Sequence, residues 1–259
     1  MTTDPTIIAF AGLAGTGKDT AAAHLVQRYG FVQAAFADPL RSMALILMEE
    51  AGIDQAWLTE RSLKESPMPG LGISARALLQ TLGTEVGRHL SPDLWTRHMG
   101  LRLGLEPNTY DGELWPRGQS LWPRQPVHDR IVISDCRFAN EAQWVKRYGG
   151  HVIRLHRHQA GEVRNHASEA QVLGLPADID IHNHGLTVDG LHALLDGAMA
   201  TLGIEPREDT APLRFTQRDP AGPWGAGVGW WGPDGQWIKP RADSAGPWGT
   251  AVDHEGGVD

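Results

Sequence analysis

GLAGTGKDT, at residues 12–20, directly follows the apolar run IIAFA at residues 7–11 and leads into an alanine-rich stretch. Gly12, Gly17 and Lys18 occupy the fixed positions of the G-x-x-x-x-G-K pattern, in which backbone N–H groups wrap a phosphate at a helix N-terminus. The order of strand, glycine-rich loop and helix therefore predicts a nucleotide-binding site. Lys18 would reach the outer phosphates of the nucleotide.

The sequence leaves the metal ligand of this loop open. The strict pattern has Ser or Thr after the lysine, with its hydroxyl on Mg²⁺, whereas this chain has Asp19 there and Thr20 one place later. Either Asp19 holds Mg²⁺ through water or Thr20 supplies the hydroxyl. The predicted phosphate-binding set is Gly12, Ala14, Gly15, Thr16, Gly17, Lys18, Asp19 and Thr20.

Composition indicates a globular protein with one good core. The chain has 259 residues, 41% of them hydrophobic, and it lacks both an apolar run of the roughly 20 residues that a membrane span needs and a signal-peptide pattern. We therefore expect a cytoplasmic protein without membrane contact, in the host cytoplasm if it is viral. The single cysteine, Cys136, excludes an internal disulfide and a cysteine-based zinc cluster. The net charge of −8 argues against binding polymeric nucleic acid but is compatible with a small anion held by a few arginines.

Apolar runs alternate with helix-period stretches, which predicts an α/β fold with a parallel sheet covered by helices on both faces. The expected strands are Thr6–Ala11, Phe31–Phe36, Arg130–Ser134, His151–Leu155 and Ile179–His182. The expected helices are Lys18–Tyr29, Pro39–Ala51, Ser74–His89, Asn140–Tyr148 and Val188–Leu202, with Ser74 and Gly30 as caps. The apolar residues of 43–48 fit the core, which we favour, or the surface of a homodimer.

Two regions interrupt this alternation. Residues 104–129 are rich in Pro, Gly and polar side chains and contain LWPR twice, which fits either an insertion that covers the site as a lid or an unstructured surface loop. Residues 206–259 hold half of the ten tryptophans and repeat AGPWG. We expect a main domain over 1–205 and an irregular Pro/Gly/Trp-rich appendage over 206–259, built from short hairpins.

Polar residues follow the expected strands at the edge where ligands of such sheets bind. Asp38 and Arg41 follow the second strand, and Asp135 and Arg137 follow the strand at 130–134. Arg41 can meet an acceptor phosphate, and Arg137 can stabilise charge on a transferring phosphoryl group. Asp135 can hold Mg²⁺ through water, accept from a base or sugar, or cap the next helix, as Asn140 also can.

The expected helix at 74–89 carries a second polar set. Arg76, Gln80 and Gly83 or Thr84 share one face, and Glu85 lies one turn from Arg88, so these residues form either a substrate-binding face or a solvated face with one ion pair.

Five segments in order resemble the bacteriophage deoxynucleoside monophosphate kinase family, within the adenylate-kinase-like P-loop kinases. They are GKDT at 17–20, FADPL at 36–40, LLQTLGTEVGR at 78–88, DCRFANE at 135–141 and HASE at 166–169. The resemblance covers residues 6 to 203 and turns Asp19 from a departure into a family feature.

The resemblance implies a P-loop kinase that uses ATP and Mg²⁺ to phosphorylate a deoxynucleoside monophosphate for DNA precursor supply. Lys18 and its loop would bind ATP, with Lys18 and Arg137 catalytic and Asn183 near the adenine. The substrate-binding set would be Asp38, Arg41, Arg76, Gln80, Glu85, Arg88, Asp135, Arg137 and Glu141. Arg154, Arg157 and Arg164 would be lid arginines. A metal site among the histidines is not expected, because they come from different strands without ligand spacing.

The choice of a phosphate acceptor also has a chemical reason. The second pKa of a phosphate monoester is about 6, so its oxygen is a nucleophile near neutral pH without a general base. Two other functions fit the same fold. One is transfer to a hydroxyl of a small metabolite or a modified base, with Asp38 or Asp135 as the base. The other is a nucleotide-binding regulatory module without turnover, whose tail docks a partner.

Overall fold

The computed structural model describes residues 5–60, 62–106, 128–157, 172 and 174–207, together with the backbone of four short strands at 109–110, 113–114, 230–231 and 237–238. The chain divides into two compact units, residues 1–215 and 216–259. In the second unit, β8 (Trp230–Trp231) pairs antiparallel with β9 (Trp237–Ile238). The domain boundary expected at residue 205 stays a prediction.

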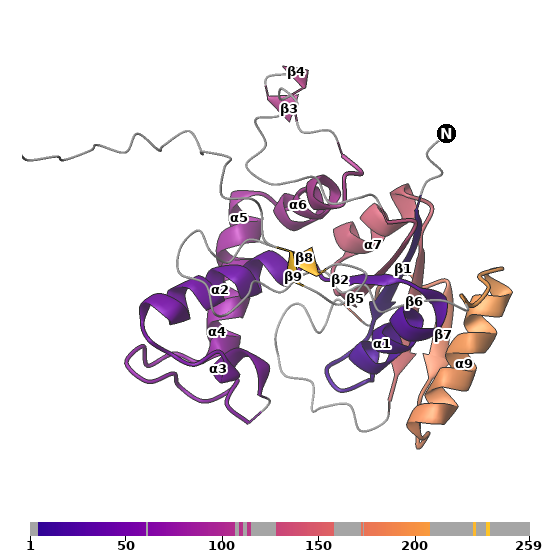
Figure 1. Cartoon of the computed structure of the whole chain (residues 1–259), viewed down its shortest axis with the longest axis horizontal. Helices are drawn as coiled ribbons and strands as arrows, with labels where there is room; N and C mark the ends of the chain where they lie inside the picture. The colour runs from indigo at the N-terminus through magenta and orange to yellow at the C-terminus, as the bar shows by residue number, and fades with distance from the viewer. Residues whose placement is uncertain are drawn as a thin grey trace, which may run out of the picture. The chain divides into compact units, whose positions relative to one another are not determined.

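The first unit is built on a five-stranded parallel sheet, as the alternating pattern predicted (Figure 1). Its strand order is β2-β5-β1-β6-β7, so β1 lies in the centre. The strands are β1 (Thr6–Ala11), β2 (Val32–Ala34), β5 (Arg130–Cys136), β6 (His151–His156) and β7 (Ile179–His182). The helices are α1 (Lys18–Tyr29), α2 (Asp38–Glu50), α3 (Ala56–Thr59), α4 (Ala75–Gln80), the π-helix η1 (Thr81–Gly87), α5 (Arg88–Leu90), α6 (Leu94–Arg102), α7 (Ala139–Arg147) and α9 (Val188–Thr201). Within the 104–129 segment, β3 (Thr109–Tyr110) pairs antiparallel with β4 (Glu113–Leu114).

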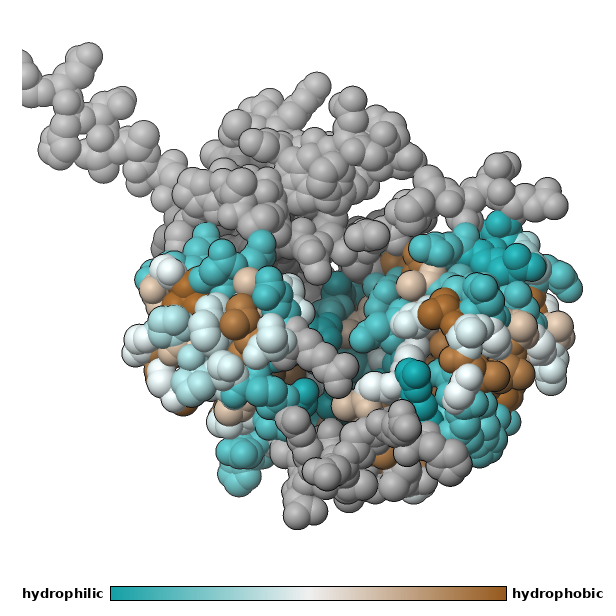
Figure 2. Space-filling view, turned by 90° about the horizontal axis from the view of Figure 1, so that it is seen from below, coloured by the Kyte–Doolittle hydropathy of each residue, from teal (hydrophilic) through white to brown (hydrophobic). Residues whose placement is uncertain are grey.

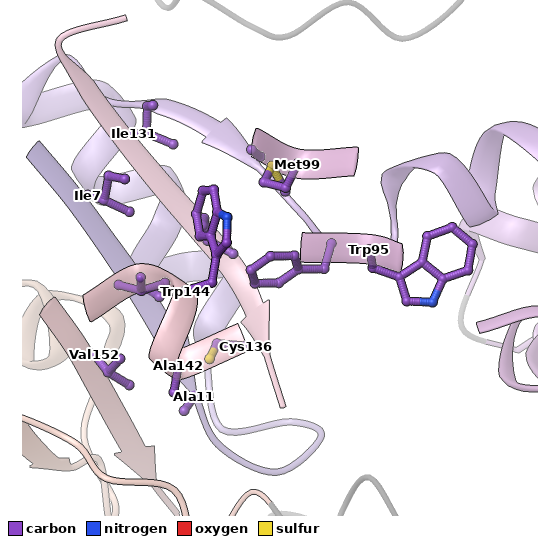
Figure 3. Packing of buried hydrophobic residues seen from close by; sticks show 14 of the residues in the cluster. Ile7, Ala11, Trp95, Met99, Ile131, Cys136, Ala142, Trp144 and Val152 are labelled. Carbon is purple, nitrogen blue, oxygen red and sulfur yellow. The ribbon is translucent and has the colours of Figure 1, made fainter. Parts of the chain in front are cut away.

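The two faces of the sheet bury separate hydrophobic clusters, because side chains alternate along each strand. On β1, Ile7, Ala9 and Ala11 pack in the cluster that contains α6 and α7, whereas Ile8 and Phe10 pack in the cluster that contains α1 and α9. Figure 1 shows α7 and α1 on opposite faces of the sheet, and Figure 3 shows the first cluster from close by. The central strands are therefore apolar on both sides, as a covered parallel sheet requires.

A smaller cluster of apolar residues holds α2, α3 and α4 together. It contains Ala44 and Met48 of α2, Leu58, Met68 and Ala75. Met43 and Leu47 of α2 are 40% and 42% exposed. The expectation that the apolar residues of 43–48 belong to the core is thus right for one face of α2 and wrong for these two side chains.

Strand β2 is shorter than the expected 31–36, because two carboxylates hold the chain that follows it. Asp38 accepts from the N–H of Ala35 at 2.9 Å. Asp135 accepts from Phe36 N at 2.8 Å and Ala37 N at 3.0 Å. These bonds hold residues 35–37 in a turn beside β5 and fix the start of α2.

The helix expected over 74–89 begins as predicted, with the Ser74 side chain capping α4 by accepting from Ala77 N. It then becomes π-helical over Thr81–Gly87. Two glycines let other elements approach this stretch closely, because a Cβ on Gly83 would lie 2.8 Å from Leu40 and one on Gly87 would lie 2.2 Å from Trp95. The indole N–H of Trp95 also donates to the carbonyl of Gly83 at 2.8 Å, so this carbonyl is bonded from outside the helix.

Candidate functional site

The glycine-rich loop lies at the carboxyl end of β1, in the centre of the sheet. Gly12, Gly15 and Gly17 have φ values of 143°, 81° and 96°, which side-chain-bearing residues rarely adopt. A Cβ on Gly12 would also lie 2.6 Å from the carbonyl oxygen of Leu155. The loop backbone therefore requires glycine, and α1, with its 12 residues, begins directly after it at Lys18.

Several side chains brace the loop from within. The ammonium of Lys18 donates to the carbonyls of Gly12 and Leu13, both at 2.7 Å. The hydroxyl of Thr16 donates to Leu13 O at 2.9 Å. Asn183, which was expected near adenine, is buried and donates from its amide to Thr16 O at 3.2 Å. Its observed contact is with the loop itself.

The first turn of α1 presents both residues considered for Mg²⁺. Asp19 is exposed and Thr20 is half-buried. Within the described ranges, no three His, Cys, Asp or Glu side chains gather as a metal site of their own.

Arg137 leaves the sheet beside this loop. Ala11, the last residue of β1, is in register with Cys136, the last residue of β5, so Gly12 and Arg137 follow two neighbouring strand ends. The pairing of β1 with β5 contains a register shift between Ala9 and Ala11. Because of this irregularity Asp135 lies inside β5, one residue before its end, rather than after it as the sequence suggested.

A cleft of about 190 Å³ opens at the same edge of the sheet. It collects most of the residues that the sequence proposed for substrate binding, from elements far apart in the chain. The predicted residues that line it are Arg41, Arg76, Gln80, Arg88, Asp135, Arg137 and Glu141. Figure 2 shows hydrophilic surface bordering the hollow between the α2–α4 side of the molecule and the sheet side.

Cationic side chains dominate the polar lining of the cleft, and some have protein partners. Arg41 pairs with Asp38 at 3.1 Å, and Arg76 pairs with Glu65. Arg137 and Lys64 also line the cleft, but no carboxylate among the described residues lies within ion-pair distance of either one. This arrangement favours an anionic ligand, because five cations line a partly enclosed space with two carboxylates, and two of the cations have no ion-pair partner among the described residues.

Arg88 and Glu141 bind each other instead of lining the cleft as independent groups. Glu141 is 3% exposed and accepts from Arg88, from Arg137 N at 2.7 Å and from Phe138 N at 3.1 Å. The guanidinium of Arg88 lies 3.5 Å from the centre of the Phe138 ring and donates to Asn140 at 3.2 Å. The pair therefore fixes the backbone that carries Arg137.

Burial controls the ionisation of Glu141. Loss of hydration and the negative charge of Asp135 raise its pKa from 4.5 to about 7, against the lowering effect of Arg88 and two backbone N–H groups. Burial likewise raises the pKa of Asp135, against the lowering effect of Arg41 and Arg137.

The other carboxylates of the predicted substrate set have different positions. Asp38 accepts from Arg102 at 2.7 Å as well as from Arg41 and Ala35 N, and it is not part of the cleft lining. Glu85 is exposed and is also outside the lining, and Arg88 pairs with Glu141 rather than with Glu85. Asp135 lines the cleft, but both of its carboxylate oxygens accept from the turn at residues 36–37 and neither caps α7.

The three arginines expected on a lid fall in different places. Arg154 lies within β6, where it pairs with Asp180 of β7 at 2.7 Å and donates to Leu175 O, so it is fixed to the sheet surface. Arg157 is exposed just after β6. Arg164 and the 166–169 segment lie outside the described residues.

The cleft also has an apolar wall that the sequence analysis did not assign. Phe36, Leu40, Leu79, Trp95 and Phe138 contribute to it, and Gln80 and Thr84 add side chains that can donate and accept hydrogen bonds. A planar heterocycle fits such a lining, because flat apolar contacts and a few polar groups together orient it. Lys64 was missed because a lone lysine between α3 and α4 carries no motif.

No known family profile matches the sequence. Over 183 residues the chain is 32% identical to a protein of Acanthamoeba polyphaga mimivirus described as "Putative deoxynucleotide monophosphate kinase", and the match covers 69% of this chain and 88% of the viral protein. Among solved structures, a sugar kinase from Janibacter sp. HTCC2649 matches with a TM-score of 0.34 at 14% identity, covering 80% of this chain and 99% of that one. Thymidylate kinase from Candida albicans matches with a TM-score of 0.32 at 14% identity, covering 81% of this chain and 98% of that one. Because it is 32% identical to the viral protein over 88% of that protein's length, the chain belongs to the deoxynucleotide monophosphate kinase family and is a P-loop kinase.

Proposed function

We propose that this kinase transfers the terminal phosphoryl group of ATP to the phosphate of a deoxynucleoside monophosphate. The observation that carries the proposal is the cleft lined by Arg137, which combines an excess of cationic side chains with an apolar wall. A nucleoside monophosphate has the same two parts, a dianionic phosphate and a flat base. The name of the viral relative supports the same substrate class.

The glycine-rich loop fits the phosphates of ATP. Its glycines carry no side chains that would cover the backbone N–H groups, so these groups can donate to a phosphate. Gly12 also has no room for a Cβ. Lys18 at the start of α1 would exchange its contacts with the loop carbonyls for the outer phosphates. Mg²⁺ would supply charge neutralisation of the phosphates, with Thr20 or Asp19 as the protein group nearest to it.

The residues of the chain then have separate tasks. The cations of the cleft bind and orient the acceptor phosphate, whose oxygen is already ionised near neutral pH. Arg137, which emerges beside the loop, stabilises the charge that spreads over the transferring group. Arg88 and Glu141 hold the backbone of Arg137 in place.

A hydroxyl acceptor is less compatible with this geometry, because it needs a general base. Asp38 is held by Arg41, Arg102 and Ala35 N. Asp135 uses both oxygens to accept from Phe36 N and Ala37 N. The two carboxylates considered for that task are therefore already engaged.

The assignment to DNA precursor supply and to the bacteriophage type of the family stays a proposal, as do a homodimer and a cytoplasmic location. Among the described helices the longest, α9, has 14 residues, and none has the length and apolar character for a bilayer crossing.

The proposal is tested by incubating the full-length protein with ATP, Mg²⁺ and, in separate reactions, each deoxynucleoside monophosphate, each deoxynucleoside and a panel of small hydroxyl metabolites. We expect diphosphate formation from at least one monophosphate and no product from the hydroxyl compounds. Lys18→Ala should lower the rate about 10³-fold or more, because a transition-state charge contact contributes several kcal/mol. Lys146→Ala is the control, because Lys146 lies on α7, pairs with Asp178 and is not part of the cleft lining. Phosphorylation of a hydroxyl compound, with no diphosphate formed from any monophosphate, would refute the phosphate-acceptor assignment.

A further inference from the structure

Lys64 is a cleft cation that no motif pointed to. It lies between α3 and α4, where its backbone N–H donates to Glu60 O at 3.1 Å and its carbonyl accepts from Arg76 N at 3.1 Å. The second bond attaches Lys64 to the first turn of α4, next to another cleft arginine. Its main chain is therefore fixed on both sides before any ligand binds.

The surroundings of the Lys64 side chain are strongly cationic. It lines the cleft together with Arg41, Arg76 and Arg137. Burial and the positive charges of these three arginines lower the pKa of Lys64, and Asp19 on the first turn of α1 acts in the opposite direction. Two of these arginines have carboxylate partners. No carboxylate among the described residues is in ion-pair contact with Lys64. Such a lysine is unfavourable in the ligand-free protein.

An anion in the cleft would remove this penalty. A phosphate dianion neutralises several cations at once, whereas a neutral ligand would leave their repulsion unchanged. Lys64 shares the cleft with Arg137, which follows the strand end next to that of Gly12, and the acceptor phosphate and the nucleotide phosphates would meet there.

We propose that Lys64 is a substrate-binding residue that contacts the acceptor phosphate together with Arg137, with which it lines the cleft. This inference rests on the proposed function and adds a residue that the family motifs do not include. Lysine acts here as a compact point charge with three donors, which suits a phosphate oxygen shared with the planar guanidinium of Arg137.

The test uses Lys64→Met, which keeps the length of the side chain and removes its charge, with Lys146→Met as the matched control on α7. We expect Lys64→Met to raise the KM of the best monophosphate about 10- to 100-fold, as the loss of a hydrogen bond to a charged group predicts. The KM of ATP should change by no more than about twofold, because the variant loses a contact with the monophosphate and none with ATP. Lys64→Arg should recover part of the difference.

Two further measurements separate phosphate binding from a structural role. The melting temperature of ligand-free Lys64→Met should equal or exceed that of the wild type, because like-charge repulsion is removed. Competitive inhibition by the matching deoxynucleoside, which has no phosphate, should not change. A lower ligand-free melting temperature, or an unchanged KM for the monophosphate, would overturn the assignment. Absence of any monophosphate turnover in the wild type would instead refute the proposed function, so the two failures are distinguishable.

Discussion

Replacing Arg88 by methionine should destabilise the protein, and more so at pH 8.5 than at pH 5.5. Arg88 is 14% exposed and donates to Glu141, to Asn140 and, at 3.4 Å, to Pro92 O, while its guanidinium stacks on Phe138. Methionine keeps the apolar contact with the ring and loses the charged bonds. A charged hydrogen bond contributes about 1.5–3 kcal/mol and a partly desolvated cation–π contact about 1–2 kcal/mol.

The pH dependence comes from Glu141. Its pKa is raised from 4.5 to about 7 in the folded protein, so the folded state binds a proton that the unfolded state releases between these values. The stability that neutral Glu141 contributes is therefore fully present below about pH 4.5 and is lost as pH rises through 7. Arg88 lowers this pKa, so removing Arg88 raises it further. Each added unit costs about 1.4 kcal/mol above the new pKa.

We therefore expect Arg88→Met to cost about 1–3 kcal/mol more in unfolding free energy at pH 8.5 than at pH 5.5. The measurement is guanidinium chloride unfolding of the ligand-free wild type and variant at both pH values. Arg97→Met is the control, because Arg97 is exposed on α6. An equal loss at both pH values would refute the reasoning, since it would mean that Arg88 does not stabilise the ionised form of Glu141.

Three further predictions concern Arg137, the glycine-rich loop and the C-terminal segment. Arg137→Lys should lower kcat/KM for the monophosphate about 10- to 100-fold with an unchanged melting temperature, because lysine lacks the bidentate fork; wild-type kinetics would assign Arg137 to structure. Gly12→Ala should abolish ATP binding and cost about 2–4 kcal/mol, whereas Gly197→Ala in α9, where a Cβ meets nothing within 4 Å, should stabilise by about 0.5–1 kcal/mol; ATP titration and thermal melting check both. A protein ending after Arg207, whose N–H donates to Arg28 O at 3.0 Å, should keep full kinase activity; a folded, ATP-binding truncation without activity would place the removed segment in the active site.

The sequence predicted the sheet because its signals are local. The strands contain apolar or alternating apolar residues, and the glycines at residues 12, 15 and 17 indicate the unusual backbone of the loop. The boundaries that moved depend on contacts between distant residues. Asp135 ends β2 from 98 and 99 positions away, and Trp95 takes the carbonyl of Gly83 that a regular helix would use. Neither contact can be predicted from the short sequence segments in which strand and helix patterns are recognised.

The same limit applies to the roles of the charged residues. The sequence placed Arg88 and Glu141 in the cleft, but only the structure pairs them over 53 positions and shows that they support Arg137. It also proposed Arg154 as a lid arginine, although Arg154 is bound to Asp180 of the neighbouring strand. Motifs identify residues that gather at one edge of the sheet, whereas the division between substrate contacts and supporting ion pairs depends on which partners are within reach.

That division would allow an acidic protein to bind the proposed anionic substrate. The chain has a net charge of −8. Beyond the Debye length of roughly 8 Å, this charge repels a long polyanion only weakly. At close range it disfavours the many cationic contacts that binding a polyanion requires. In the cleft, Glu65 and Glu141 neutralise Arg76 and Arg88, whereas no described carboxylate pairs with Lys64 or Arg137. Among the described cations that line the cleft, Lys64 and Arg137 are thus left to pair with an anionic ligand. A ligand with a single phosphate would engage both of these cations, whereas a polymer needs many such contacts along its length.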